Sequence, residues 1–279
     1  DGPRPSFGSA WAILSVGYLV SNVLPLRAGD GARAWLVHTR TPGDGAQALG
    51  TVVAERVVDL ITILLFLGLW VPGPGARFLT GLFGLGPWSR PGLLGAMSVG
   101  AAVAGMVVLG VTAGSADRAA AAALAAGRAL GINIEGSRRL AFGTHRFVSA
   151  VAVLGRPAVA TRVMVWSVVV WWIGAVGYWL VFRAFALDLP LAAAVLAVCA
   201  AALFAAALPP TPGYAGPFHA AVREAVVVYG AVPVVIGTSY AIVLHALTLA
   251  VIVAMGVVGM AVLGASWGSL HLGEPPAAR

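Results

Sequence analysis

The stretch "NVLPLRAGDGARAW", residues 22–35, interrupts an apolar run with a proline and three charged side chains. Pro25 lacks a backbone donor and Gly29 tolerates unusual dihedral angles, so a helix over 8–24 is expected to end here. A new helix is expected to restart near Asp30, because aspartate suits an N-cap position. The stretch therefore predicts two short helices where one long helix would otherwise run.

Composition places this break in a membrane. Of the 279 residues, 60% are hydrophobic and 10% are charged, and the mean hydropathy is +0.94. A soluble domain carries about a quarter charged residues. The apolar runs are continuous and often exceed about eighteen residues, which indicates helices and not the alternating strands of a β-barrel. We therefore expect an all-α polytopic membrane protein, a helical bundle with re-entrant or broken half-helices.

Seven apolar segments organise the chain, and we expect a single membrane domain over residues 1–279. The segments are 8–24, 46–71, 92–113, 163–187, 190–208, 214–230 and 234–264. Three of them are expected to cross the membrane once, namely 46–71, 92–113 and 163–187, and 234–264 is long enough to cross with tilt. The remaining three are short or broken by Pro and Gly, which favours half-helices.

The placement of arginines predicts which parts of the chain lie on the cytoplasmic side of the membrane. The segment 114–162 holds seven arginines against Asp117 and Glu135. By the positive-inside rule this segment is expected on the cytoplasmic side of the cell membrane, together with the C-terminus. Within it, the Ala-rich run 115–130 predicts a helix that either lies at the lipid interface or is simply solvated.

A short internal similarity points to an inverted repeat. "LPLRAG" at 24–29 and "LPPTPG" at 208–213 each place a glycine four residues after a Leu-Pro pair. Interrupted segments in corresponding halves are typical of a transporter's binding region. We expect two hairpins that enter the membrane from opposite faces: 8–24 with 30–40, and 190–208 with 214–230. Chance similarity over six positions is the alternative.

The first candidate site follows Pro25. A helix N-terminus in or near the membrane favours an anion. Arg27 and Arg33 add forked donors that suit phosphate, and Asp30 limits the positive field. This pattern predicts a site for a lipid phosphate. A cytoplasmic loop in which the arginines snorkel and pair with Asp30 stays open as the alternative.

The second candidate site is the triplet Glu55, Arg56 and Asp59 in "VVAERVVDLITILLFL". Only the stretch from Leu60 to Val71 follows it before the apolar run ends, and that stretch would span roughly 18 Å of the ~30 Å hydrocarbon core. Ionisable groups at that depth need a polar interior. We expect them to converge in one cavity, open to the cytoplasmic leaflet, whose members are Arg27, Arg33, Glu55, Arg56 and Asp59. A structural ion pair that joins helices is the alternative.

The third candidate site lies in "LPPTPGYAGPFHAAVREA", residues 208–225. Its prolines and glycines break the helix at membrane depth, which is tolerated against protein or a wet cavity. His219 and Arg223 are four residues apart and share a helix face. A re-entrant turn is therefore expected, and a plain extramembrane loop is the alternative.

Other signatures are missing from the sequence. Cys199 is the single cysteine, so no internal disulfide and no cysteine-based metal site is expected. The five histidines lack metal-ligand spacing, and there is no G-x-x-x-x-G-K motif and no lysine. No cofactor and no bound metal are expected, and the dispersed arginines do not suggest nucleic acid.

These stretches resemble the lysylphosphatidylglycerol synthase transmembrane-domain family of flippase-like membrane proteins. The resemblance runs from about Trp11 to Gly264 and rests on "NVLPLRAGDGARAWLV", "TVVAERVVDLITILLF" and "PPTPGYAGPFHAA", in the family's order. His219 departs from the family pattern, in which Glu or Gln is frequent, and His245 stands where relatives have Arg or His. Members usually carry further N-terminal membrane helices, which are expected to be missing from this chain. Three groups of residues match the family's motifs: Asn22, Pro25, Arg27, Gly29, Asp30 and Arg33; Glu55, Arg56 and Asp59; and Pro212, Gly213, Gly216 and Phe218.

The resemblance implies translocation of a membrane lipid between leaflets, and the expected substrate is a phospholipid or a lipid-linked anionic head group. Two alternatives stay open: a membrane-embedded transferase acting on a lipid-linked substrate, and a non-catalytic membrane partner of a separate lipid synthase or glycosyltransferase. A homodimer also stays open, and no catalytic residue is assigned. The expected substrate-binding residues are Asn22, Arg27, Asp30, Arg33, Glu55, Arg56, Asp59, Gly213, His219, Arg223 and His245.

Overall fold

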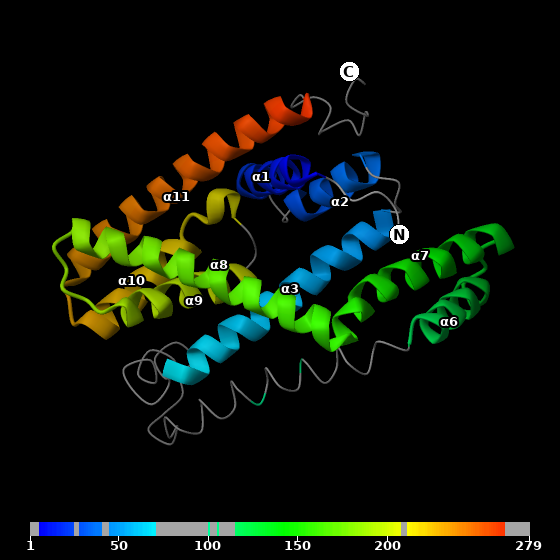
Figure 1. The fold of residues 1–279 in the computed structure, drawn as a ribbon, viewed down its shortest axis with the longest axis horizontal. Helices are drawn as coiled ribbons and strands as arrows, with labels where there is room; N and C mark the ends of the chain where they lie inside the picture. The colour runs from blue at the N-terminus through cyan, green and yellow to red at the C-terminus, as the bar shows by residue number, and fades with distance from the viewer. Residues whose placement is uncertain are drawn as a thin grey trace. The chain divides into compact units, whose positions relative to one another are not determined.

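The computed structural model describes residues 6–24, 28–40, 45–70, 100, 105, 115–207 and 211–265. Every element assigned over these ranges is a helix, so the all-α prediction holds for them (Figure 1). The predicted crossing segment 92–113 and the predicted site residue Arg27 lie outside the described residues, apart from positions 100 and 105 of the former. The elements are α1 (Phe7–Val23), α2 (Ala28–Arg40), α3 (Gly45–Trp70), α6 (Ala116–Ala129), α7 (Ile134–Ala152), η1 (Val153–Gly155), α8 (Pro157–Ala184), α9 (Leu191–Ala207), η2 (Pro212–Tyr214), α10 (Pro217–Gly230) and α11 (Val234–Leu263).

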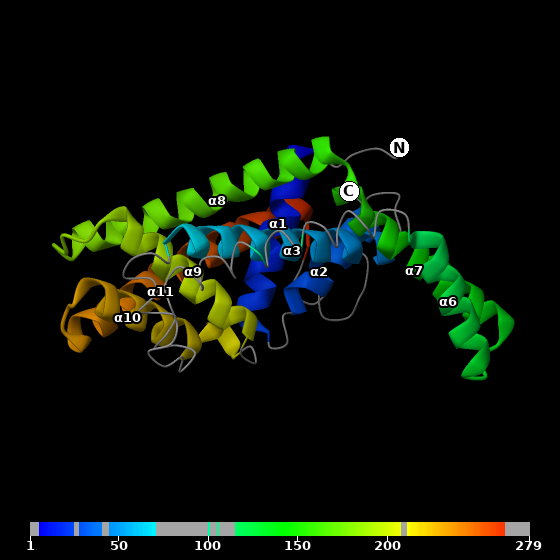
Figure 2. The ribbon, with the colours of Figure 1, turned by 90° about the horizontal axis from the view of Figure 1, so that it is seen from below.

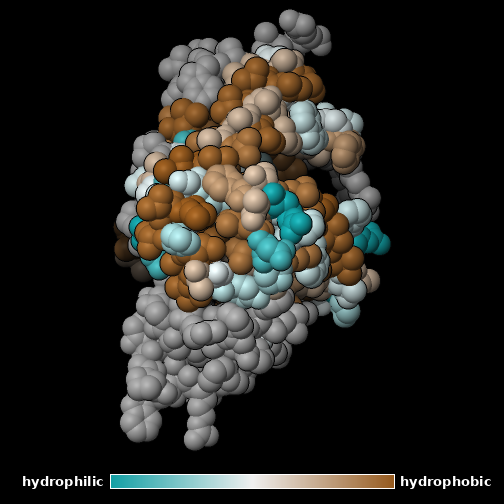
Figure 3. Space-filling view, turned by 90° about the vertical axis from the view of Figure 1, so that its left-hand side faces the viewer, coloured by the Kyte–Doolittle hydropathy of each residue, from teal (hydrophilic) through white to brown (hydrophobic). Residues whose placement is uncertain are grey.

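Two of these helices are long and apolar enough to cross a membrane. They are α8, with 28 residues, and α11, with 30 residues. Only 11% and 17% of their apolar windows are buried, so most of their apolar side chains face outward, as a lipid-facing helix requires. Apolar side chains likewise dominate the described part of the surface drawn in Figure 3. These helices fit the predicted crossings 163–187 and 234–264.

The chain divides into two compact units. The first unit comprises Asp1–Arg56, Val108–Ala160 and Leu249–Arg279, and the second comprises Val57–Val107 and Thr161–Thr248. The boundaries fall inside α3, α8 and α11, so each of these helices contributes one part to each unit.

Helices α1 and α2 form an antiparallel hairpin in the first unit, and Figure 1 draws them side by side. Gly17 of α1 lies against Arg33 of α2, and Ser21, one turn later, lies against Gly29, one turn earlier. A β-carbon at Gly29 would collide with the Gly17 carbonyl oxygen and the Ser21 hydroxyl, so glycine sets the distance between the two backbones. Behind them lies a small apolar core of Ala12, Ile13, Val16, Val20, Leu36 and Leu263.

Helices α6 and α7 form a second hairpin of the first unit and lie side by side in Figures 1 and 2. Gly127 of α6 has no side chain and so leaves room for Ser137 of α7. The Asn133 side chain caps α7 by accepting a hydrogen bond from the backbone N–H of Gly136 at 2.7 Å. Most side chains of both helices are exposed or half-buried, which is typical of a helix pair outside a core. The helix predicted over 115–130 is confirmed as α6.

Helices α9 and α10 form the central hairpin of the second unit. Gly230 at the end of α10 packs against Leu189, just before α9 begins, so these two helices are also antiparallel. Both helices contribute fully buried alanines to the apolar core of this unit, among them Ala193, Ala197, Ala221 and Ala225. The hairpins expected at 8–24 with 30–40 and at 190–208 with 214–230 therefore exist as helix pairs.

Candidate functional site

Four charged side chains of the first unit form two crossed ion pairs. Arg33 of α2 donates to both carboxylate oxygens of Glu55 of α3, with Nη1–Oε1 at 3.2 Å and Nη2–Oε2 at 2.5 Å. Arg56 of α3 donates through Nη2 to Oδ1 of Asp30 of α2 at 3.0 Å. Each helix thus supplies one acid and one base, and each base binds the acid of the other helix.

Local geometry positions this network. Asp30 and Arg33 are three residues apart on α2 and share a face, and their closest charged atoms lie 4.0 Å apart. The aliphatic stem of Arg33 lies against Gly17 of α1, so the glycine that brings the hairpin together also makes room for the arginine. The Arg33 side chain is only 10% exposed, and Glu55, at 35%, is its bidentate partner. A buried guanidinium requires such a partner.

The network can exchange partners with a ligand. It balances two cations against two anions and offers two planar guanidinium forks, which match phosphate oxygens, and two carboxylates, which match an ammonium group. Arg56 is the more accessible of the two arginines, with 41% of its side chain exposed. The guanidinium of Arg56 is therefore the more open of the two to an approaching anion.

Asp59 belongs to the second unit and makes a different set of contacts. Its Oδ1 accepts from the Ser167 hydroxyl at 3.2 Å and from the Trp171 indole N–H at 3.1 Å. Ser167 also bonds the Thr62 hydroxyl at 3.0 Å, so the carboxylate sits in a chain of neutral donors. The structure brings Arg33, Glu55, Arg56 and Asp30 together, while the inclusion of Asp59 and Arg27 in the same cavity stays a prediction.

Ser167 and Trp171 are the site residues that the sequence reading missed. Both lie in the run "VMVWSVVVWW" of α8. Ser167 stands out there as a hydroxyl side chain in an otherwise apolar stretch, and it lies one helical turn from Trp171. Polar side chains in a crossing helix usually face a partner, and that rule could have identified them.

The third predicted site is a tight turn that leads into α10. Gly213 and Gly216 adopt φ of +63° and +95°, which L side chains rarely adopt, and this explains glycine at both positions. The Thr211 hydroxyl donates to the carbonyl of Ala215 at 2.9 Å and closes the turn. His219, on the first turn of α10, contacts the His245 ring of α11.

The other predicted residues have local partners. Asn22 donates to the carbonyl of Tyr18, one turn back on its own helix, at 2.9 Å. Arg223 pairs with its neighbour Glu224 at 2.7 Å. Among the described residues, no cluster of three or more His, Cys, Asp or Glu is arranged to hold a metal ion.

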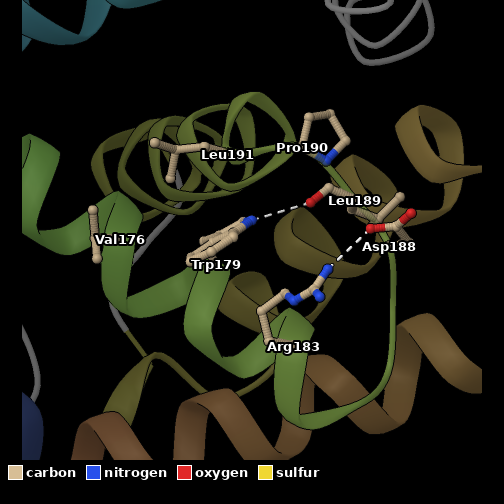
Figure 4. A pocket seen from close by; sticks show the side chains of 7 residues that line it. All are labelled: Val176, Trp179, Arg183, Asp188, Leu189, Pro190 and Leu191. Atoms are coloured by element: carbon tan, nitrogen blue, oxygen red, sulfur yellow. Dashed lines mark hydrogen bonds and ion pairs between the residues drawn. The ribbon is translucent and has the colours of Figure 1, made fainter.

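A separate cavity of about 510 Å³ lies where α8 ends and the chain turns into α9 (Figure 4). Arg183 and Trp179 point into it, and the guanidinium carbon lies 5.9 Å from the centre of the indole ring. Arg183 also donates to Asp188 at 2.9 Å, and the Trp179 N–H donates to the carbonyl of Leu189 at 3.2 Å. Tryptophan and arginine at the end of an apolar helix are typical of the membrane interface.

Comparison of the sequence with known protein families identifies one family over most of the chain. The profile described as lysylphosphatidylglycerol synthase TM region matches residues 2–256. The chain belongs to this family. It is therefore an integral, multi-pass membrane protein, and the family suggested by the three sequence stretches is confirmed. Comparison of this member of the lysylphosphatidylglycerol synthase TM region family with curated proteins and with solved structures gave no match.

Proposed function

We propose that the protein translocates a phospholipid, or a lipid-linked anionic head group, between the two leaflets of the cell membrane. The observation that carries this proposal is the crossed pairing of Arg33 with Glu55 and of Arg56 with Asp30. Four ions held between two helices of a membrane chain are costly unless they serve a polar ligand or hold the helices together.

Partner exchange is the proposed mechanism. A lipid phosphate first binds Arg56, because 41% of the Arg56 side chain is exposed and only 10% of the Arg33 side chain is. The phosphate then competes with Glu55 for Arg33, and its oxygens replace the carboxylate oxygens in the same bidentate geometry. The internal pairs re-form when the head group leaves, so the site keeps its charges paired when empty.

The name of the family suggests a more specific substrate. Lysylphosphatidylglycerol carries a phosphate and also ammonium groups. Asp30 and Glu55, once released by their arginines, offer carboxylates for those ammonium groups. We propose that a head group with both charges is preferred over a purely anionic one.

The proposed path across the membrane uses the two broken hairpins as re-entrant elements of an inverted repeat. At about 1.5 Å per residue, α1 and α9 reach about 25 Å, and α2 and α10 reach only about 20 Å, which is short of a ~30 Å core. We propose that the hairpins enter from opposite faces and that the arginine-rich segment 114–162 lies in the cytoplasm. We expect a thiol reagent to label Gly43→Cys only from the cytoplasmic side of the membrane and Ala231→Cys only from the external side.

Translocation can be measured with the full chain in liposomes that contain fluorescent phosphatidylglycerol. Wild-type protein is expected to expose the inner-leaflet pool to a membrane-impermeant quencher. Arg56→Gln should slow the rate at which this lipid reaches the quencher by about tenfold, which is the loss expected for one charged hydrogen bond to phosphate. Glu135→Gln is the matched control, because Glu135 lies in an exposed pair with Arg139 on α7.

Two results would overturn the proposal. One is a wild-type rate no faster than that of protein-free liposomes. The other is an equal loss of rate in Arg56→Gln and Glu135→Gln, both eluting as monodisperse protein, since the crossed pairs would then have no special role. Unlabelled lysylphosphatidylglycerol is expected to compete more strongly than unlabelled phosphatidylglycerol, and equal competition would remove the preference for two charges.

A further inference from the structure

Two histidine rings meet beside the glycine turn in the second unit. Nε2 of His219 and Nδ1 of His245 lie 2.9 Å apart, and the ring centroids lie 4.6 Å apart. Phe218 stacks on His245 with its centroid at 4.6 Å and an interplanar angle of 24°. His245 is 6% exposed, whereas His219 is only half-buried. The pair therefore has one ring in the interior and one with access to the outside.

The partners of the two rings determine where their protons lie. The backbone N–H of Gly216 donates to Nδ1 of His219 at 3.3 Å, so this nitrogen accepts through its lone pair. Its proton must be on Nε2, from which it is donated to Nδ1 of His245. The proton of His245 is then on Nε2, which is left to donate to the backbone of Gly213. These partners fix which nitrogen donates and which accepts along the two rings.

The neighbouring ionisable groups are committed to other partners. On α10, Arg223 and Glu224 pair with each other at 2.7 Å. On α11, the Tyr240 hydroxyl donates to the carbonyl of Tyr178 on α8 at 2.9 Å, and the Tyr178 ring lies edge-on to Phe218. Cys199 of α9 is buried. The same elements of this unit also carry Tyr214 in the turn, Tyr229 on α10, and Arg162 and Arg183 on α8, of which Arg183 pairs with Asp188 at 2.9 Å.

We propose that His219 and His245 form a site that binds one proton, and that binding of this proton opens the turn over Pro212–Gly216. The proton adds to Nδ1 of His219, where a new N–H bond uses the lone pair that accepts from Gly216. The hydrogen bond to Gly216 is lost, and two N–H groups then face each other. Gly216, the residue before α10, loses its contact with the histidine, and the turn is then held by the bonds of Thr211 to Tyr214 and Ala215 and moves at its α10 end.

The site accepts a single proton because of the bond between the rings. That bond needs one nitrogen with a lone pair, and the second ring supplies it. A second proton would break the hydrogen bond between the rings. It would also place two positive charges about 4.6 Å apart in the protein interior. The ligand is a proton from water on the half-buried side of His219, and no oxidant or other reactant takes part. This site stands independently of lipid translocation.

Thiol labelling of the turn tests the proposal. Ala215→Cys places a thiol in the exposed turn, and Ala231→Cys places one at the other end of α10. The labelling rate of the first variant is divided by that of the second, so that the pH dependence common to both thiols cancels. The wild-type chain, whose Cys199 is buried, gives the background. We expect the ratio to rise at least about threefold between pH 8 and pH 5.5. Gln accepts from Gly216 but takes no proton, so His219→Gln is expected to abolish the rise.

A second measurement counts the proton. Nitrogen NMR of ring-labelled histidine in the full chain in lipid nanodiscs should show the signals of His219 and His245 changing together in one step. His245→Gln and His219→Gln supply the assignments, and each variant should elute as monodisperse protein. The proposal is overturned if the two rings titrate in two separate steps that each add a proton, or if the labelling ratio rises equally in His219→Gln.

Discussion

The two hairpins share a topology and differ in how they handle polar groups. Helices α1 and α2 approach each other closely at Gly17 and Gly29. Helix α2 then presents charged side chains to α3, where Arg33 binds Glu55. Helices α9 and α10 contribute buried alanines to the core, and α10 presents an imidazole to α11, where His219 contacts His245. One sequence pattern, Leu-Pro followed by Gly, thus introduces an ionic site in one unit and a neutral site in the other. The ionic site is costly to break, and the neutral site is easy to rearrange.

The largest expected effect is the loss of one ion from the first hairpin. Arg33→Gln leaves Glu55 without its bidentate partner, and we expect a loss of about 3 kcal/mol in the free energy of unfolding, the low end for a broken buried pair, because Glu55 is 35% exposed. The double variant Arg33→Gln/Glu55→Gln should recover more than half of the loss, since two amides can pair. Reversible unfolding in mixed detergent measures both.

Absence of recovery in the double variant would contradict the ion-pair account. The loss would then reflect packing of the Arg33 stem against Gly17 rather than its charge. Arg33→Met separates the two explanations, because it keeps most of the stem and removes the charge.

The second prediction tests the glycine contact that makes room for those ions. Gly29→Ala should cost about 2 kcal/mol, because its β-carbon meets the Gly17 carbonyl oxygen and the Ser21 backbone. Gly31→Ala is the matched control on the same helix, with nothing within 4 Å of the added carbon. Alanine favours a helix over glycine by about 1 kcal/mol, so the control should be neutral or slightly stabilising. Equal effects at both positions would mean that close approach does not hold this hairpin.

The two helix breaks at the prolines were predictable because they depend on local chemistry, whereas α8 begins at Pro157, six residues before the expected start. The break after residue 24 and the break after residue 207 follow from prolines and glycines, and α1 and α9 end within one residue of the expected positions. The charged candidate site residues could also be identified from the sequence, because ionisable side chains are conspicuous in an apolar run. The confirmed family rests on the same local stretches.

Partner choice was not predictable from spacing. Asp30 and Arg33 are neighbours on one helix, yet the bidentate partner of Arg33 is Glu55, 22 residues away. Ser167 reaches Asp59 across 108 residues, and His245 reaches His219 across 26. Such contacts depend on how helices pack, and periodicity within one helix carries no information about its neighbour.

The third prediction concerns the neutral donors around Asp59 in the second unit. Trp171→Phe removes an indole N–H that lies 3.1 Å from the carboxylate, and we expect a loss of about 1.5 kcal/mol, the low end for a hydrogen bond to a charged group. Trp166→Phe, at a residue of the same helix that is 63% exposed, should change stability by less than about 0.5 kcal/mol. An equal loss in both variants would show that indole size, not the hydrogen bond, matters here.

The smallest expected effect lies in the α6–α7 pair, which supplies the water-exposed reference for the ionic hairpin. Glu135 and Arg139 pair at 3.2 Å with side chains 65% and 80% exposed, whereas Arg33 in its pair is 10% exposed. An exposed pair four residues apart on a helix contributes about 0.5 kcal/mol or less, and salt screens it. Glu135→Gln should therefore shift the unfolding midpoint slightly at low salt and not at all at 1 M salt, while the effect of Arg33→Gln persists at both. If the two variants responded alike to salt, burial would not be what distinguishes the ionic hairpin, and its charges would have to be accessible to solvent ions.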